Sequence, residues 1–173
     1  MTRLSGRLLD VRVSDRHTAE GFTLFALRTG DLVVADRGYC RRGQLAYVLR
    51  TGAHVVVRLA VLQTPLLDEQ GRPFDVLAWL KERGSGQHQC AVAFEHEGCR
   101  FAARLIACSV SAEEAERVRA RQRRKANKKQ RQLKEATLYL CGWFVLLTSL
   151  PADAWSDEQV LTLYRARWQI EIV

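Results

Sequence analysis

The stretch GDLVVADRGY, residues 30–39, decides the fold because a short apolar run ends in an acidic residue. The run from Leu32 to Ala35 is wholly apolar and rich in valine, a pattern typical of a strand in a sheet covered by helices. Asp36 follows at the carboxyl end of this strand, which is the edge where open α/β sheets bind ligands. Aspartate is also a common turn residue after a strand, so this stretch alone leaves both interpretations open.

The other elements follow from hydrophobic periodicity, helix caps and turn residues. We predict helices over 41–50, 74–82, 111–135 and 157–173, and strands over 1–13, 53–60, 89–95, 100–108 and 143–148. Ser111 and Ser156 each begin a capping box, which is typical of a helix start. Glu97 and Gly98 separate two strand-like runs, where the glycine suits a hairpin turn.

Positive charge is concentrated in one segment. The net charge is +8, and residues 117–134 hold ten basic and no acidic side chains, which leaves the rest of the chain at −2. The ten are Arg117, Arg119, Arg121, Arg123, Arg124, Lys125, Lys128, Lys129, Arg131 and Lys134. A solvated charged face is the alternative, but like charges at helical spacing cost about 0.2–0.5 kcal/mol per pair, and a polyanion removes that cost. The segment therefore indicates contacts to a nucleic-acid backbone, above all from Arg121, Arg123, Arg124 and Lys125.

Composition excludes several classes of protein. Hydrophobic residues make up 47% and charged residues 27%, as in globular domains, and no apolar run has the roughly 18 residues of a membrane span. The amino-terminal residues show no signal-peptide pattern. The five cysteines are widely spaced without a CxxC, which favours a reducing cytoplasm over a disulfide framework. The set His88, Cys90, His96 and Cys99 is only loosely like a zinc site, and we favour buried cysteines and surface histidines.

The last predicted helix carries an unusual face. Tyr164, Arg167 and Glu171 are spaced by three and four residues, so they share one side of a helix. An arginine–glutamate surface pair beside a packed aromatic residue explains the spacing as well as a functional site does. The helix alone therefore leaves these two interpretations open.

Three stretches, taken together, resemble the DDE-type transposases of bacterial insertion sequences, in particular the insertion-sequence-four class. The string YRARWQIE, residues 164–171, is similar to the Y-x2-R-x3-E signature of that class. Residues 30–39 resemble the segment that holds the second catalytic aspartate, and residues 143–151 resemble the strand before the signature helix. The matches occur in family order and frame nearly the whole chain.

The resemblance implies an α/β fold with an RNase H-like mixed sheet, flanking helices and a β-rich insertion between the second aspartate and the glutamate. We accordingly expect four segments: 1–60 as a partial catalytic core, 61–110 as the insertion, 111–138 as the basic helix, and 139–173 as the last core strand and signature helix. Residues 32–35 and 144–148 are expected to be neighbouring strands. The signature helix is expected to bring Glu171 toward Asp36.

The resemblance also implies a chemistry. Asp36 and Glu171 match two of the three acidic residues that bind two Mg²⁺ or Mn²⁺ ions, and Tyr164 and Arg167 match residues that contact DNA near the cut. Hard divalent ions prefer carboxylate oxygens, and two of them can serve an in-line displacement at phosphorus. The implied activity is cleavage and strand transfer on double-stranded DNA at transposon ends, by a full-length enzyme that can be a homodimer.

The chain departs from the family pattern at both ends. No residue is assigned as the first catalytic aspartate, although Asp10, Asp15 and Asp31 precede Asp36, and the lysine that follows the signature falls beyond Val173. We interpret the chain as a catalytic-domain fragment that is inactive alone, with a two-metal site only in the complete enzyme. The alternatives are a non-catalytic transposase-derived DNA-binding remnant and an unrelated basic scaffold protein that matches by chance.

Overall fold

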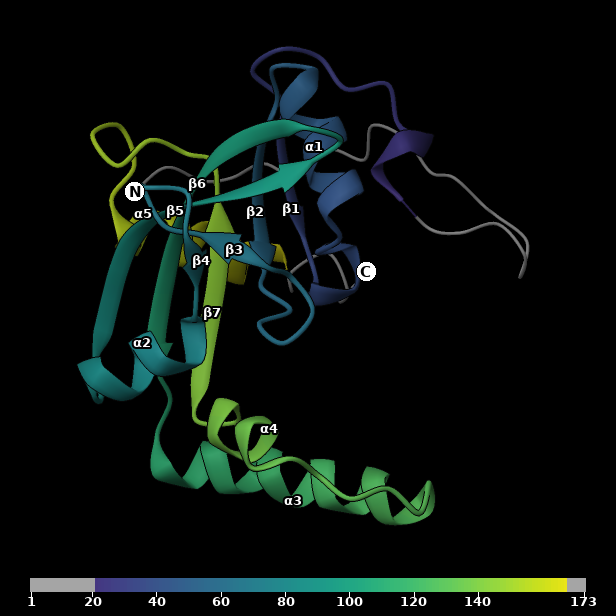
Figure 1. Cartoon of the computed structure of the whole chain (residues 1–173), viewed down its shortest axis with the longest axis vertical. Coiled ribbons are helices and arrows are strands. Elements are labelled where there is room, and N and C mark those ends of the chain that lie inside the picture. Colours follow the sequence, from purple (N-terminus) through teal and green to yellow (C-terminus); the bar gives the residue numbers. More distant parts are fainter. Residues whose placement is uncertain (1–20, 168–173) are drawn as a thin grey trace.

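The structure, a computed structural model, describes residues 21–167 (Figure 1). Its helices are α1 (Arg42–Arg50), α2 (Val76–Arg83), α3 (Ala112–Lys128), α4 (Glu135–Leu140) and α5 (Asp157–Ala166), with 3-10 turns η1 (Phe22–Leu24) and η2 (Arg37–Tyr39). Its strands are β1 (Leu32–Ala35), β2 (His54–Arg58), β3 (Leu66–Leu67), β4 (Pro73–Phe74), β5 (Gln87–His96), β6 (Cys99–Ser109) and β7 (Trp143–Thr148). The strand expected over 1–13 lies outside the described residues.

The strands form one mixed sheet in the order β1-β2-β7-β6-β5-β3-β4. The β1–β2 pair is parallel, and the other pairs are antiparallel. The α/β, RNase H-like class is thereby confirmed, but residues 32–35 and 144–148 are not neighbours, because β2 lies between them. Strand β2 is central and covered on both faces, since Val55, Val56 and Val57 are at most 2% exposed, whereas β1 is partly exposed and lies at an edge of the described sheet.

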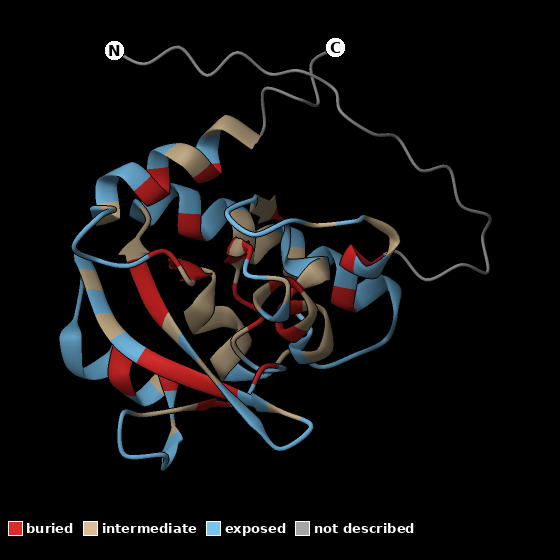
Figure 2. Cartoon of the chain, turned by 90° about the horizontal axis from the view of Figure 1, so that it is seen from above, coloured by how far each residue is buried: buried red, intermediate tan, exposed pale blue. Residues whose placement is uncertain are grey.

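Hydrophobic clusters cover both faces of the sheet, and the alternation of side chains along each strand assigns residues to them. On one face, Val55 and Val57 pack in a cluster with residues of α1 and α2. On the other, Val56 packs with Leu146 and with α5, which contributes Val160, Leu161 and Tyr164. Figure 2 shows the buried residues following the central strands and the inner sides of the helices. Helix α5 therefore covers the face of the sheet opposite to the one that α1 and α2 cover.

The long hairpin β5–β6 extends the core sheet, because β6 pairs with β7 along residues 104–109. Its turn is at Glu97 and Gly98, which have φ values of 51° and 72°, as the sequence predicts. The tip reaches α1, where Arg50 pairs with the Glu97 carboxylate at 2.8 Å and Arg42 donates to the carbonyl oxygen of Glu95 at 3.0 Å. Residues 61–110 thus supply strands to the same sheet that contains β1 and β2.

Helix α3 projects from the end of the sheet, with α4 lying back against it (Figure 1). It begins as expected, with the Ser111 hydroxyl accepting from the Glu114 amide at 3.2 Å, but it ends at Lys128 rather than near residue 135. Gln130, at φ 49°, reverses the chain, and α4 then returns it to β7. No glycine or proline marks this stop. Within residues 21–167, no helix is both long and apolar enough to cross a membrane.

Candidate functional site

Asp36 ends β1 at the carboxyl edge of the parallel strand pair. It caps η2, and its Oδ1 accepts a hydrogen bond from the amide of Arg37 at 2.6 Å. Leu32 and Val34 pack with the cluster under α5, whereas Ala35 packs on the opposite face. The extended backbone at Asp36 continues this alternation and puts its exposed carboxylate on the α5 face.

Arg58 occupies the equivalent place at the end of β2. Ala35 pairs with Val57, so Asp36 and Arg58 each follow a paired residue by one step. The Arg58 guanidinium carbon lies 5.2 Å from the centre of the Phe144 ring on β7, within range of a cation–π interaction. Among the described residues, the ion pairs include neither Asp36 nor Arg58. A carboxylate and a guanidinium thus follow the two parallel strands at the same edge of the sheet.

Tyr164 brings α5 into the same place. Its side chain is 1% exposed, and its ring meets that of Phe144 edge-on, with centroids 5.3 Å apart. The Arg167 guanidinium carbon lies 5.5 Å from the centre of the Tyr164 ring on its own helix. Arg58, Phe144, Tyr164 and Arg167 therefore form a continuous series of cationic and aromatic groups.

Burial and nearby charges shift the pKa of the Tyr164 phenol. Burial raises its pKa most, and the negative charge of Asp36 raises it further. The guanidiniums of Arg167 and Arg58 lower the same pKa, by less than burial and Asp36 raise it. Electrostatically, Asp36, Arg58, Tyr164 and Arg167 thus belong to one site.

The structure brings together three of the site residues that the sequence points to, Asp36, Tyr164 and Arg167. Glu171 and its neighbour Trp168 lie outside the described residues, so the expected approach of Glu171 to Asp36 stays a prediction. Arg58 is the functional candidate that sequence reasoning missed. Its signal was present, because HVVVR, residues 54–58, ends in a charged residue just as LVVAD, residues 32–36, does.

The described residues do not by themselves fit a two-ion site. Among residues 21–167, no group of three or more His, Cys, Asp or Glu side chains could hold a metal ion. Asp36 contributes one carboxylate, a suitable ligand for a hard cation, with Oδ1 already accepting one hydrogen bond. The loosely zinc-like set does not converge either: His88 Nε2 bonds the Gly84 carbonyl at 3.1 Å, and Cys99 is at the hairpin tip as a free, exposed thiol.

The basic segment divides into paired and unpaired cations. Glu116 accepts from Arg123 at 2.8 Å and from Arg119 at 3.4 Å, so these two arginines are partly neutralised within α3. Arg121, Arg124 and Lys125 are exposed, and the ion pairs of the described residues do not include them. Arg131 and Lys134, expected in the helix, lie in the loop after it and at the cap of α4. Lys128, Lys129, Arg131 and Lys134 are also exposed and outside these ion pairs. Of these seven cations, Arg121, Arg124 and Lys125 lie close together within α3 and are the candidates for contact with a polyanion.

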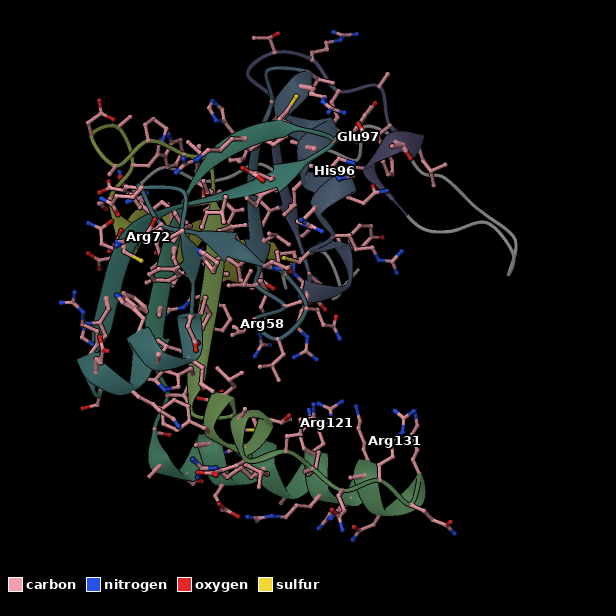
Figure 3. All side chains as sticks on the ribbon, viewed as in Figure 1. Arg58, Arg72, His96, Glu97, Arg121 and Arg131 are labelled. Atoms are coloured by element: carbon pink, nitrogen blue, oxygen red, sulfur yellow. The ribbon has the colours of Figure 1, made fainter. Side chains whose placement is uncertain are left out.

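The basic helix and the sheet edge share one electrostatic region. Cys141, just after α4, has its pKa raised by burial, while Arg119 and Arg123 of α3 act with Arg37 and Arg58 of the sheet edge to lower it. Figure 3 shows Arg121 and Arg131 pointing from the α3 region toward the side of the molecule where Arg58 lies. Positive charge from two distant parts of the sequence is thus gathered on the side of Asp36.

Comparison with known proteins gives the same family. Residues 4–173 match the family described as a transposase DDE domain. The chain is 34% identical over 170 residues to the putative transposase InsL for insertion sequence element IS186A of Escherichia coli strain K12, and equally so to the transposase for insertion sequence element IS421 of Escherichia coli. Each alignment covers 94% of this chain and 46% of the relative, so the chain spans about half the length of these curated proteins. With its mixed sheet and the order of its motifs, the chain belongs to the transposase DDE domain family.

Proposed function

We propose that this chain supplies part of the DNA-cleaving site of a cytoplasmic transposase that acts on double-stranded transposon ends. The observation that carries the proposal is the convergence of Asp36, Arg58, Tyr164 and Arg167 at the carboxyl edge of β1 and β2. A carboxylate beside two arginines and a phenol suits a phosphodiester whose phosphate is bound next to a metal ligand.

Each residue has a distinct role in this proposal. Asp36 is a metal ligand, and Glu171 is a second one, as the signature of the family implies. These two carboxylates would hold a divalent ion, which would supply Lewis-acid chemistry to the phosphate and to the attacking oxygen. Arg58 and Arg167 hold phosphate oxygens, because guanidinium groups match them in a two-pronged geometry. Two aromatic rings hold the arginines in place, because Arg58 packs on Phe144, Arg167 packs on Tyr164, and the two rings meet edge-on.

The exposed cations of α3 supply sequence-independent contacts to the DNA backbone. Arg121 points toward the side on which Arg58 lies (Figure 3), which favours one duplex contacting both regions. Such contacts release counterions, which makes binding fall steeply with salt. The homodimer expected for the full-length enzyme stays a prediction.

The proposal is tested by duplex binding in fluorescence anisotropy, with Arg58→Gln and Arg167→Gln compared with Arg83→Gln. Arg83 is an exposed arginine at the end of α2 and serves as the control. Loss of one phosphate contact flattens the log–log salt dependence by about 0.9, and we expect that change only in the first two variants. Equal slopes in all three would contradict a DNA site at this edge.

The rival function, a DNA-binding remnant without a metal site, predicts the same anisotropy result and differs in metal binding. We expect Mn²⁺, followed by electron paramagnetic resonance, to bind the chain in the presence of duplex. Binding should weaken in Asp36→Asn and in Glu171→Gln. Asp31→Asn is the matched control, because Asp31 precedes β1, the strand that Asp36 follows. Its Oδ2 accepts a hydrogen bond from the Arg28 amide at 2.7 Å. Mn²⁺ binding that is equally strong in the wild-type chain, Asp36→Asn and Glu171→Gln would favour the DNA-binding remnant.

A further inference from the structure

Arg104 is a buried arginine, 7% exposed, that no motif in the sequence singles out. It lies on β6 two residues before Ile106, which packs in the cluster under α5, so Arg104 is on that face too. Its Nη1 donates to Asp157 Oδ1 at 2.8 Å and to Gln89 Oε1 at 3.3 Å, and its Nη2 donates to the Trp155 carbonyl oxygen at 2.8 Å. Its guanidinium thus bonds the segment where α5 begins.

Helix α5 crosses the sheet from this anchor to the candidate site. Its cluster includes Ile106 of β6, Leu146 of β7 and Val56 of β2, and the helix also contacts β1. Asp157 is the first residue of α5, and Tyr164 follows seven residues later, about 10 Å along the helix axis. A shift at the amino end therefore moves the Tyr164 end with it.

Apolar packing alone leaves the position of such a helix loosely defined. Contacts of Val160 and Leu161 with the sheet are non-directional, so they allow small slides and rotations. The Ser156–Gln159 capping box fixes where the helix begins in the sequence, and it does not attach the helix to the sheet. The charged hydrogen bonds from Arg104 are directional and join α5 to β6 at a fixed place.

We propose that Arg104 is a positioning residue, which holds the amino end of α5 on β6 so that Tyr164 packs on Phe144 at the candidate site. The proposal rests on the function proposed above, because it assigns Arg104 a role in assembling that site. Arg104 acts through Asp157 and Trp155. It also links the strand-rich segment 61–110 to the signature helix, so the two segments move as one unit.

The test separates positioning from stability by removing one charge or both. Arg104→Met leaves the half-buried Asp157 carboxylate without its cation and should lower the melting temperature by roughly 10 °C. Arg104→Met combined with Asp157→Asn removes both charges and should recover most of that loss, because a buried ion pair contributes little net stability. We therefore expect the double variant to fold without the anchor.

The readouts in the full chain are the titration of Tyr164 and the affinity for a duplex. The titration is followed by fluorine NMR of protein labelled with 3-fluorotyrosine, with the resonance assigned by Tyr164→Phe. In the double variant we expect the Tyr164 pKa to fall toward its ordinary value, because the ring loses burial and moves from Asp36. We expect duplex affinity to fall about tenfold, within the range for one lost arginine contact.

Arg100→Met is the matched control, because Arg100 lies on the same strand and bonds the carbonyl oxygens of Asp68 and Glu69 instead of α5. A double variant that keeps the wild-type Tyr164 titration overturns the positioning role. If it does not fold, Arg104→Lys decides by the same titration, because lysine keeps the charge but cannot reach all three acceptors. Failure of the wild-type chain to bind duplex contradicts the proposed function and leaves the titration as a separate test of Arg104.

Discussion

Asp36 and Arg58 lie at the same level of two adjacent parallel strands, because Ala35 pairs with Val57. Their charges act in opposite directions on the pKa of Tyr164, which Asp36 raises and Arg58 lowers. The pKa of the Tyr164 phenol on α5 therefore responds to the charges at the ends of both strands. This relationship can be tested without DNA or metal.

Asp36→Asn should lower the pKa of Tyr164, and Arg58→Gln should raise it, since each variant removes one of the two opposing charges. Fluorine NMR of 3-fluorotyrosine-labelled protein measures both shifts. Asp31→Asn, at the other end of β1, should change nothing. If Asp36→Asn left the Tyr164 titration in place, the carboxylate would not face α5.

The raised pKa of Tyr164 makes the free energy of unfolding depend on pH in the alkaline range. Because its pKa is higher in the folded than in the unfolded chain, the associated stability is fully present below the ordinary tyrosine value of about 10. It is lost as the pH rises through the folded-state pKa. Urea unfolding between neutral and alkaline pH should therefore show a smaller loss in Tyr164→Phe than in the wild-type chain, and an equal loss would contradict the assignment.

The basic segment should respond unequally to charge removal. Replacing Arg121, Arg124 and Lys125 by Gln should flatten the log–log salt dependence of duplex binding by up to about 2.7, or 0.9 per phosphate contact. Arg123→Gln should have a smaller effect than Arg121→Gln, because Glu116 already pairs with Arg123 at 2.8 Å. Arg28, Arg72 and Arg83 replaced together give a control with the same change in net charge. A control slope as flat as that of the α3 variant would show that only net charge matters.

The hairpin turn should be sensitive to its glycine. Gly98→Ala places a side chain at φ 72° and should destabilise the chain by about 1–2 kcal/mol in urea unfolding. Gly38→Ala is the matched control, because Gly38 has no positive φ and an added Cβ meets no atom within 4 Å. Equal midpoints for the two variants would mean that the turn relaxes at little cost.

Local patterns predicted most of the elements, and long-range pairing explains the failures. Runs such as residues 32–35 and 143–148 identify strands, but nothing in either run shows that β2 lies between them. The end of α3 was missed because Lys128 precedes no glycine or proline, and the chain turns there to return to β7. In the candidate site, motifs predict roles for Asp36, Tyr164 and Arg167. Arg58 and Arg104 belong to no motif, and their partners are distant in sequence.

We expect the purified chain not to nick supercoiled plasmid with Mg²⁺ or Mn²⁺. Two-ion catalysis needs carboxylates that bridge and orient both ions, and the family signature assigns only Asp36 and Glu171 here. With these two carboxylates alone, a second ion and the attacking oxygen would have no fixed positions, and each decade of rate corresponds to about 1.4 kcal/mol of barrier.

A plasmid nicking assay with Asp36→Ala and Glu171→Ala alongside the wild-type chain tests this expectation. The two variants should behave like the wild-type chain, because the wild-type chain itself is expected not to nick the plasmid. The contrary result is equally specific. Metal-dependent nicking that disappears in both variants would show that the chain carries a complete site. It would also point to Asp10 as the third ligand, because that residue lies in the strand-like segment before Asp36. Asp10→Ala would then have to abolish nicking too, while Asp31→Ala, next to β1 at its opposite end, would leave it intact.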